Sequence, residues 1–418
     1  MRGAVRVLRK GRFRALAPPV TVEELARLHE RAALALLGFG VTLPVFLEPG
    51  HLSSPRLSDL GLVFALPMIV TRWRRLGRRL RGFCAASVVV LLLTPMLQMV
   101  KIGQTPNLPD LVFWSRWIAA AVAATAAAHA VVADRRRRRL FFLAMTAGVA
   151  CHLATYGLLE IMGRGGLEAV GLASPRAALT TAAAQARITT VAEHPNAAMA
   201  LIGLAVPACL AASATTIERR LLAYVGASMV LAGFVCTLSR GGTLAAALAM
   251  LVWVVIRATR ADGRNPLEFL ILTCLLAGAA LVDQVIGGVV DIARFAARFD
   301  ASTLDENIGG RVETWVRALG FIANHPLGVG WSSPQELGPF RGLTVSHNGY
   351  LFMARTVGVV AAAALLALHV RSALKLDVFA PLAVFVLVMM SSEDLTQGAS
   401  FIFIACLTAA LAFRRQAP

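Results

Sequence analysis

Four stretches of the chain place arginine, histidine and asparagine directly beside long apolar runs. They are ARITTVAEHPNAAMALIG (186–203), TLSRGG (237–242), GGRVETWVRALGFIANHPLGVGW (309–331) and SHNGYLFMARTVG (346–358). Arginine is permanently cationic, and its planar guanidinium binds phosphate oxygens through paired hydrogen bonds. Histidine changes its charge near neutral pH and so suits general-base work. These residue types together indicate a site that holds a phosphate or pyrophosphate while a nearby hydroxyl is activated.

Arg187, Arg240 and Arg311 would hold a pyrophosphate head group if they converged near a membrane surface, with a lipid tail left in the bilayer. His347 would take the proton of an acceptor hydroxyl, which would attack the donor carbon as the lipid pyrophosphate leaves. The arginines would stabilise the charge that develops on the leaving group. We expect a metal-free reaction, because these stretches contain no Asp/Glu cluster with metal-ligand spacing.

Each of these residues also has an ordinary structural explanation. Arg240 would serve equally well as an interfacial anchor that reaches lipid phosphates. Arg187 and Arg311 would be solvated loop residues. His347 would be part of a helix cap, with Ser346 or Asn348 as the N-cap residue. The spacing of these residues does not by itself decide between the two kinds of explanation.

The elements that position these residues belong to a membrane protein. Of the 418 residues, 57% are hydrophobic and only 15% are charged, whereas soluble domains are nearer half apolar and a quarter charged. Apolar runs long enough to cross a bilayer recur along the chain, with few tyrosines and no dyad alternation, which argues against a β-barrel. We expect an all-α integral membrane protein that forms a single polytopic domain over residues 1–418.

The apolar runs predict about twelve transmembrane helices, at 32–48, 57–71, 82–100, 111–133, 140–162, 197–214, 221–238, 241–257, 267–288, 349–370, 377–392 and 399–413. If both termini lie in the cytoplasm, most of the 41 lysines and arginines fall in segments on the cytoplasmic side of the membrane. The basic N-terminal segment 1–31 is one of these segments. This distribution obeys the positive-inside rule. The net charge of +18 is therefore a topology signal, and no nucleic-acid partner is expected.

Two outside segments are long under this topology. One is the loop 163–196, and the other is the periplasmic loop 289–348 between spans nine and ten. Long loops gathered on one face commonly carry function. All four polar stretches then lie at the outer face, so the loop 289–348 and its surroundings are expected to hold the catalytic motifs.

The chain resembles the O-antigen ligase and polymerase superfamily of bacterial envelope proteins. Its architecture is similar, and four motifs appear in order between about 180 and 370. The matching residues are Arg187, Pro195 and Asn196; Ser239, Arg240 and Gly241; Arg311, Trp315 and the Pro-x-Gly-x-Gly segment 326–330; and His347, Asn348, Tyr350, Leu351 and Gly358.

The resemblance implies an enzyme of the bacterial inner membrane whose active site faces the periplasm, without a cofactor. Arg240 and Arg311 would grip the pyrophosphate of an undecaprenyl-linked glycan, and His347 would activate the acceptor hydroxyl. The remaining site residues would bind substrate: Arg187, Asn196, Ser239, Asn348, Tyr350 and Arg355. A ligase would use a sugar of the lipid A core as acceptor, and a polymerase another lipid-linked repeat unit; the ligase is favoured. Membrane lipids would surround the protein.

One position departs from the superfamily. Many relatives carry a glutamate two residues before the glycine that follows the histidine motif, and here that position is Thr356, beside Arg355. Arg355 falls inside span ten, where a charge is costly unless it faces a polar cavity or a partner such as Asp283. A transporter or flippase would need a polar path through the membrane, for which the sequence supplies little beyond these residues, Arg116 and Glu160. A non-catalytic envelope scaffold would tolerate loss of the outer arginines.

Overall fold

The computed structural model describes residues 21–47, 55–102, 108–173, 190–192, 194–237, 239–259, 301–330, 348–392 and 399–414. Within these ranges the chain is helical, and the one bridge between extended residues joins Phe46 to Arg56. The all-α class is therefore confirmed. The predicted span 267–288 and the residues Arg187, Asp283 and His347 lie outside the described residues.

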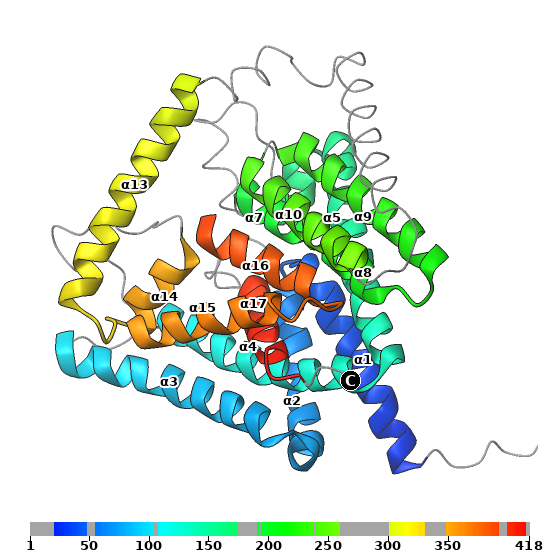
Figure 1. Ribbon diagram of the computed structural model, residues 1–418, viewed down its shortest axis with the longest axis horizontal. Coiled ribbons are helices and arrows are strands. Elements are labelled where there is room, and N and C mark those ends of the chain that lie inside the picture. The colour runs from blue at the N-terminus through cyan, green and yellow to red at the C-terminus, as the bar shows by residue number, and fades with distance from the viewer. Residues whose placement is uncertain are drawn as a thin grey trace, which may run out of the picture.

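The first part of the bundle contains α1 (Val22–Thr42), α2 (Leu57–Arg72), the short 3-10 helix η1 (Trp73–Arg75), α3 (Arg78–Ile102), α4 (Leu108–Ala133) and α5 (Arg135–Ala169). The second part contains α7 (Pro195–Ile202), α8 (Ala205–Ala212), α9 (Thr216–Thr237), α10 (Arg240–Thr259), α13 (Ala301–Asn324), α14 (Gly349–Val357), α15 (Val359–Ala373), α16 (Ala380–Ser392) and α17 (Ala399–Leu411). Every predicted span except 267–288 has helix at its position (Figure 1).

Four described segments are long and apolar enough to cross a membrane: Trp114–Ala133, Arg135–Ala169, Pro195–Ala212 and Ile217–Thr237. Shorter apolar helices accompany them, among them Val359–Ala373 and Ala380–Ser392. Helices of this length and composition support a membrane protein. The total of twelve spans, the side of the termini and the outer position of the loop 289–348 stay predictions.

Small residues allow the helices to pack closely. α1 lies against α5 and α2, α4 lies against α2 and α17, and α10 lies against α16. A Cβ added to Gly38 of α1 would collide with the carbonyl oxygen of Phe141 in α5. Much of α4 consists of fully buried alanines, among them Ala120, Ala124 and Ala127. Small side chains at such interfaces let backbones approach, which is how helices associate in lipid.

One predicted span is broken, and one predicted loop begins as helix. Span 349–370 is divided between α14 and α15 at Gly358, whose φ is 99°. Span 197–214 contains α7 and α8 as one apolar segment, because Gly203 and Leu204 between them keep helical φ and ψ. The loop predicted at 163–196 is helical up to Ala169, because α5 continues past a kink at Gly163 with φ 65°. Glycine adopts positive φ at little cost, and an averaged hydropathy does not register such a change of backbone direction.

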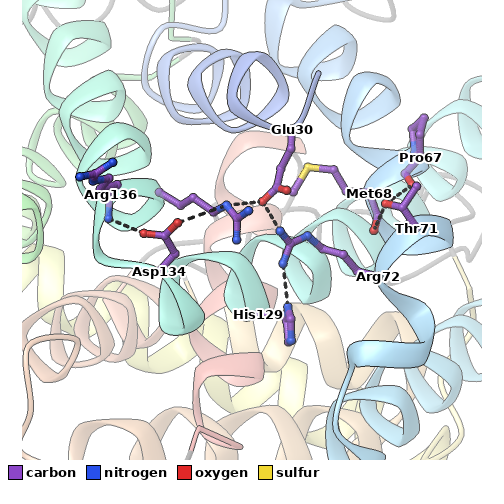
Figure 2. A network of polar contacts seen from close by, with 9 residues as sticks. Glu30, Pro67, Met68, Thr71, Arg72, His129, Asp134 and Arg136 are labelled. Atoms are coloured by element: carbon purple, nitrogen blue, oxygen red, sulfur yellow. Dashed lines mark hydrogen bonds and ion pairs between the residues drawn. The ribbon is translucent and has the colours of Figure 1, made fainter. Parts of the chain in front are cut away.

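Two charged clusters are buried between the helices. Arg116 of α4 forms an ion pair with Asp59 of α2 at 2.9 Å, and their side chains are 10% and 17% exposed. In the second cluster, Glu30 of α1 binds Arg72 of α2 and the Nε of Arg137 of α5, the latter at 2.8 Å. Arg72 also lies 3.1 Å from Nδ1 of His129, as Figure 2 shows. The second cluster joins α1, α2, α4 and α5 at the predicted cytoplasmic end, whereas the Arg116–Asp59 pair joins α2 and α4 at the predicted outer end.

Glu30→Ala is expected to destabilise the protein by about 3–5 kcal/mol, because it leaves the buried Arg72 without its carboxylate, whereas Arg137 keeps Asp134 at 3.5 Å. Glu23→Ala in the same helix is the matched control, since Glu23 pairs with Arg27 at an exposed position. Thermal unfolding of the purified protein in detergent measures both. Equal melting temperatures for the two variants would show that the buried cluster contributes no more than a surface pair.

Candidate functional site

Three of the four polar stretches meet at the C-terminal end of α16. Nη1 of Arg311 donates to the carbonyl oxygen of Ser392 at 2.9 Å. Nδ2 of Asn348 donates to the carbonyl oxygen of Ser391 at 3.0 Å. A Cβ on Gly241, in the first turn of α10, would stand 3.6 Å from Oγ of Ser392. The structure thus brings Gly241, Arg311 and Asn348, one residue from each of three stretches, around one helix end.

The remaining polar stretch, which begins at Ala186, supports the start of α10 through Asn196. Oγ of Ser239 donates to Oδ1 of Asn196 at 2.9 Å, and both residues are buried. His194 is the N-cap of α7, and its Nδ1 accepts from the backbone N–H of Asn196 at 3.2 Å. A Cβ on Gly242 would stand 2.5 Å from Cγ of Met199. Asn196 and Ser239, both expected to bind substrate, therefore hold the starts of α7 and α10 together.

Arg240 is the first residue of α10. A helix N-terminus presents unpaired N–H groups and the positive end of the helix dipole, so it favours an anion. Arginine at this position adds a full positive charge to that end of the helix. The backbone of Arg240 is described and its side chain is not.

A cavity of about 510 Å³ opens between α13 and the end of α16. Its lining residues are Arg311, Val312, Trp315, Leu387, Val388, Ser391 and Ser392. The guanidinium and the indole N–H are donors, whereas Leu387, Val388 and Val312 form an apolar wall. Nε1 of Trp315 is buried and finds no acceptor among the described residues. A buried donor without an acceptor is costly, so this N–H suits an acceptor oxygen of a ligand.

Asn348 caps the helix that follows it. Its Oδ1 accepts from the backbone N–H groups of Tyr350 and Leu351, both at 3.0 Å, and it is the N-cap of α14. Of the two N-cap candidates in the sequence, Ser346 and Asn348, Asn348 is therefore the one that caps this helix. Because its amide nitrogen also donates to Ser391, the start of α14 is attached to the end of α16. His347 precedes this cap in the sequence and lies outside the described residues.

Tyr350 points into the helix packing. Its hydroxyl lies 2.8 Å from Nδ1 of His369, and Nε2 of His369 lies 2.9 Å from the carbonyl oxygen of Ala405. A carbonyl oxygen only accepts, so Nε2 of a neutral His369 carries the proton and Nδ1 accepts from the tyrosine. Tyr350 is only 9% exposed. It was expected at the substrate, but it links α14 to α15 and α17 and is not among the residues that line the cavity.

The Pro-x-Gly-x-Gly segment pairs with the break between α14 and α15. Gly328 and Gly330 have φ values of 79° and 78°, in the region that favours glycine. A Cβ on Gly328 would stand 2.6 Å from the carbonyl oxygen of Thr356. Three backbone hydrogen bonds join the two segments: Val329 N–H to the Arg355 oxygen at 2.8 Å, Gly330 N–H to the Thr356 oxygen at 3.0 Å, and Val359 N–H to the Pro326 oxygen at 2.9 Å.

Arg355 and Thr356 have structural explanations at this break. Arg355 lies in the last turn of α14, where a cation is favoured by the helix dipole, and its guanidinium lies 4.9 Å from the centroid of the Phe352 ring. Thr356 is fully buried and donates to the carbonyl oxygen of Phe352 at 2.7 Å. The helix end thus lowers the cost of a charge that a continuous span would carry deep in the membrane. Its suggested partner, Asp283, lies outside the described residues.

Gly328→Ala is expected to destabilise the protein by at least about 1–2 kcal/mol, because alanine is strained at positive φ and its Cβ meets the Thr356 oxygen. Gly320→Ala in α13 is the control, since a Cβ there meets nothing within 4 Å and alanine favours a helix by up to about 1 kcal/mol. Thermal unfolding in detergent measures both variants. If Gly328→Ala melted at the wild-type temperature, the pairing of 326–330 with the helix break would not be a structural requirement.

Sequence reasoning missed the residues at the centre of the arrangement. Ser391 and Ser392 bind Asn348 and Arg311 through their carbonyl oxygens, and Leu387 and Val388 line the cavity. The available signal was the polar pair that ends an apolar run at the predicted outer face. This signal is weak, because every residue has a backbone carbonyl oxygen and the residue type therefore does not indicate which one binds a side chain.

The comparisons with known proteins bear on this region. A family model described as O-antigen ligase matches residues 225–366. This range includes Arg240, Arg311 and Asn348 and ends before the α16 residues that line the cavity. No curated protein matches the chain.

Proposed function

The chain belongs to the O-antigen ligase and polymerase superfamily, and we propose that it transfers a glycan from an undecaprenyl-pyrophosphate carrier to the hydroxyl of an acceptor sugar. We assign the lipid A core as acceptor, which makes the protein an O-antigen ligase. The reaction takes place at the periplasmic face of the bacterial inner membrane, with membrane lipids around the protein.

The observation that carries this proposal is the cavity at the end of α16. It combines two kinds of donor, the guanidinium of Arg311 and the indole N–H of Trp315, with an apolar wall. A polyprenyl pyrophosphate has the complementary parts, which are acceptor oxygens on phosphate and an isoprenoid chain. Bidentate arginine–phosphate contacts are strong and orient the phosphate. A soluble sugar substrate would have no use for the apolar wall.

In the proposed reaction, His347 removes the proton of the acceptor hydroxyl as its oxygen bonds to the anomeric carbon of the donor. The bond between that carbon and the pyrophosphate oxygen breaks, and the configuration at the carbon inverts. Arg311 and Arg240 stabilise the negative charge on the departing pyrophosphate. Because these cations neutralise the leaving group, the reaction is proposed to need no metal ion.

The other site residues take mainly positioning roles in this account. Asn348 joins the start of α14, next to His347 in sequence, to the end of α16. Asn196 and Ser239 fix the start of α10 and so the location of Arg240. Arg187 assists at the pyrophosphate, and Arg355 adds a cation at the break after α14.

A repeat-unit polymerase is the alternative from the same superfamily, with a second lipid-linked unit as acceptor. A transporter or flippase is supported less well. It would need polar groups along a path through the membrane, and Arg116, one of the few candidates, is paired with Asp59 between α2 and α4.

The proposal is tested with the full-length protein in liposomes, supplied with an undecaprenyl-pyrophosphate glycan and purified lipid A core in excess chelator. The expected product is core that carries the glycan. Longer lipid-linked glycans without modified core would identify a polymerase. Absence of both products with and without added divalent cation would contradict a glycosyltransferase, and product formed only with added divalent cation would contradict the metal-free reaction.

A further inference from the structure

A second cavity, of about 810 Å³, shares no lining residue with the cavity at the end of α16. It lies where the first turn of α3 meets the C-terminal end of α15 and the residues that follow α17. Figure 1 shows these three helices in the lower half of the molecule. The lining residues are Arg79, Ala367, Val370, Arg371, Leu374, Lys375, Phe413 and Arg414. Half of them are basic and none is acidic.

Only one of the four cations is neutralised by a carboxylate in the described part of the chain. Arg414 binds Asp377 through Nη2 and Nε, each at 2.5 Å, and Oγ of Ser372 at 2.9 Å. Lys375 donates to the carbonyl oxygen of Arg414. Arg79 and Arg371 are exposed and form no ion pair with a described residue. The cavity therefore retains positive charge.

The surroundings of Lys375 show the effect of this charge. Burial lowers the pKa of Lys375, and Arg414, Arg371 and Arg79 lower it further, while Asp377 opposes them. Positive charges also repel one another in the first turn of α3, because this turn carries arginines at the positive end of the helix dipole and has no acidic residue. An anion in the cavity would relieve both kinds of repulsion.

The apolar lining is arranged along one stripe of α15. Ala367, Val370 and Leu374 are spaced so that they share a helix face, and Arg371 lies next to them at the C-terminal end. Val370 and Leu374 are 37% and 72% exposed. Phe413 forms the facing wall, with its ring 5.8 Å from that of Phe83 in α3. The cavity thus has a cationic end and an apolar flank that continues along α15.

We propose that this cavity binds the phosphate of an anionic phospholipid, with the head group between Arg79, Arg371 and Lys375 and an acyl chain along Val370 and Ala367. Under the proposed topology the cavity faces the cytoplasmic leaflet, whose anionic lipids attract basic residues. The chain's own terminal segments do not complement it, because MRGAVRVLRKGRFR and Arg415 are also cationic. Inorganic phosphate shares the head-group chemistry but would leave the apolar flank unused.

The test compares phosphatidylglycerol with phosphatidylcholine of the same acyl chains, added to the purified full-length protein and quantified by native mass spectrometry. Phosphatidylglycerol is expected to bind more tightly. The double variant Arg79→Gln/Arg371→Gln is expected to bind it about 30-fold more weakly, at about 1 kcal/mol for each cation near the surface. The matched control is Arg74→Gln/Arg78→Gln, which removes two exposed arginines of the same region that do not line the cavity.

Three outcomes would overturn the proposal. One is equal binding of the two lipids, and another is equal weakening in the two double variants, which would indicate diffuse attraction only. The third is displacement of phosphatidylglycerol by inorganic phosphate or glycerol phosphate at a similar concentration, which would indicate a site for a soluble anion. The readout is lipid binding, so it does not depend on glycan transfer.

Discussion

Arg311→Ala is expected to lower glycan transfer by about 100- to 1,000-fold while the protein still inserts into the membrane. The guanidinium lines the cavity at the end of α16, where charge on the leaving pyrophosphate would develop. Transfer is measured with the liposome assay, and insertion by the amount of protein recovered from the membrane fraction. Arg311→Lys should retain part of the activity, because lysine keeps the charge but loses the planar fork.

Arg317→Ala is the control for this variant. Arg317 lies in the same helix, is 64% exposed and pairs with Glu313. Because Arg311 also donates to the carbonyl oxygen of Ser392, its removal weakens one helix end, and thermal unfolding must accompany the activity measurement. Wild-type transfer in Arg311→Ala would contradict the proposed role, and so would an equal loss in Arg317→Ala.

His347→Ala is expected to lower the rate by about 100- to 10,000-fold, the usual contribution of a general base. With wild-type protein the rate should rise with pH as the histidine loses its proton. The variant should lack that rise, which distinguishes a base from a residue that only supports the fold. The measurement is the initial rate of transfer across a pH series, with both substrates saturating.

His325→Ala is the matched histidine control for this second variant. His325 follows α13, its ring lies 4.7 Å from that of Phe321, and it is not among the residues that line the cavity. It should retain both activity and the pH profile. If the His347→Ala variant kept the wild-type dependence of rate on pH, His347 would not be the general base.

Helix positions and the cap of α14 could be predicted because they depend on local features of the sequence. Apolar runs indicate where helix forms, and Asn348 in front of such a run satisfies the first N–H groups of the helix. The break at Gly358 could not be predicted, because it depends on backbone pairing with residues 326–330. A regular apolar run gives no sign of a partner segment elsewhere in the chain.

The candidate site could be predicted only in part, because some of its residues are recognisable from local sequence and others depend on the fold. Arg311 and Asn348 are polar residues in distinctive places, and they do meet at one helix end. Tyr350 was assigned to the substrate because of its motif, but packing directs its hydroxyl to His369. Ser391 and Ser392 act through backbone oxygens, so their contribution is visible only once the fold is known.

The most direct test of the account is the lipopolysaccharide profile of a strain that lacks this protein. We predict lipid A core without O-antigen, together with accumulation of the lipid-linked polymer, and recovery of the full ladder with the wild-type chain but not with Arg311→Ala. A single repeat unit left on the core would assign the protein as a polymerase. An unchanged ladder, with no accumulated lipid-linked glycan, would contradict the proposal that this protein transfers glycan from an undecaprenyl-pyrophosphate carrier.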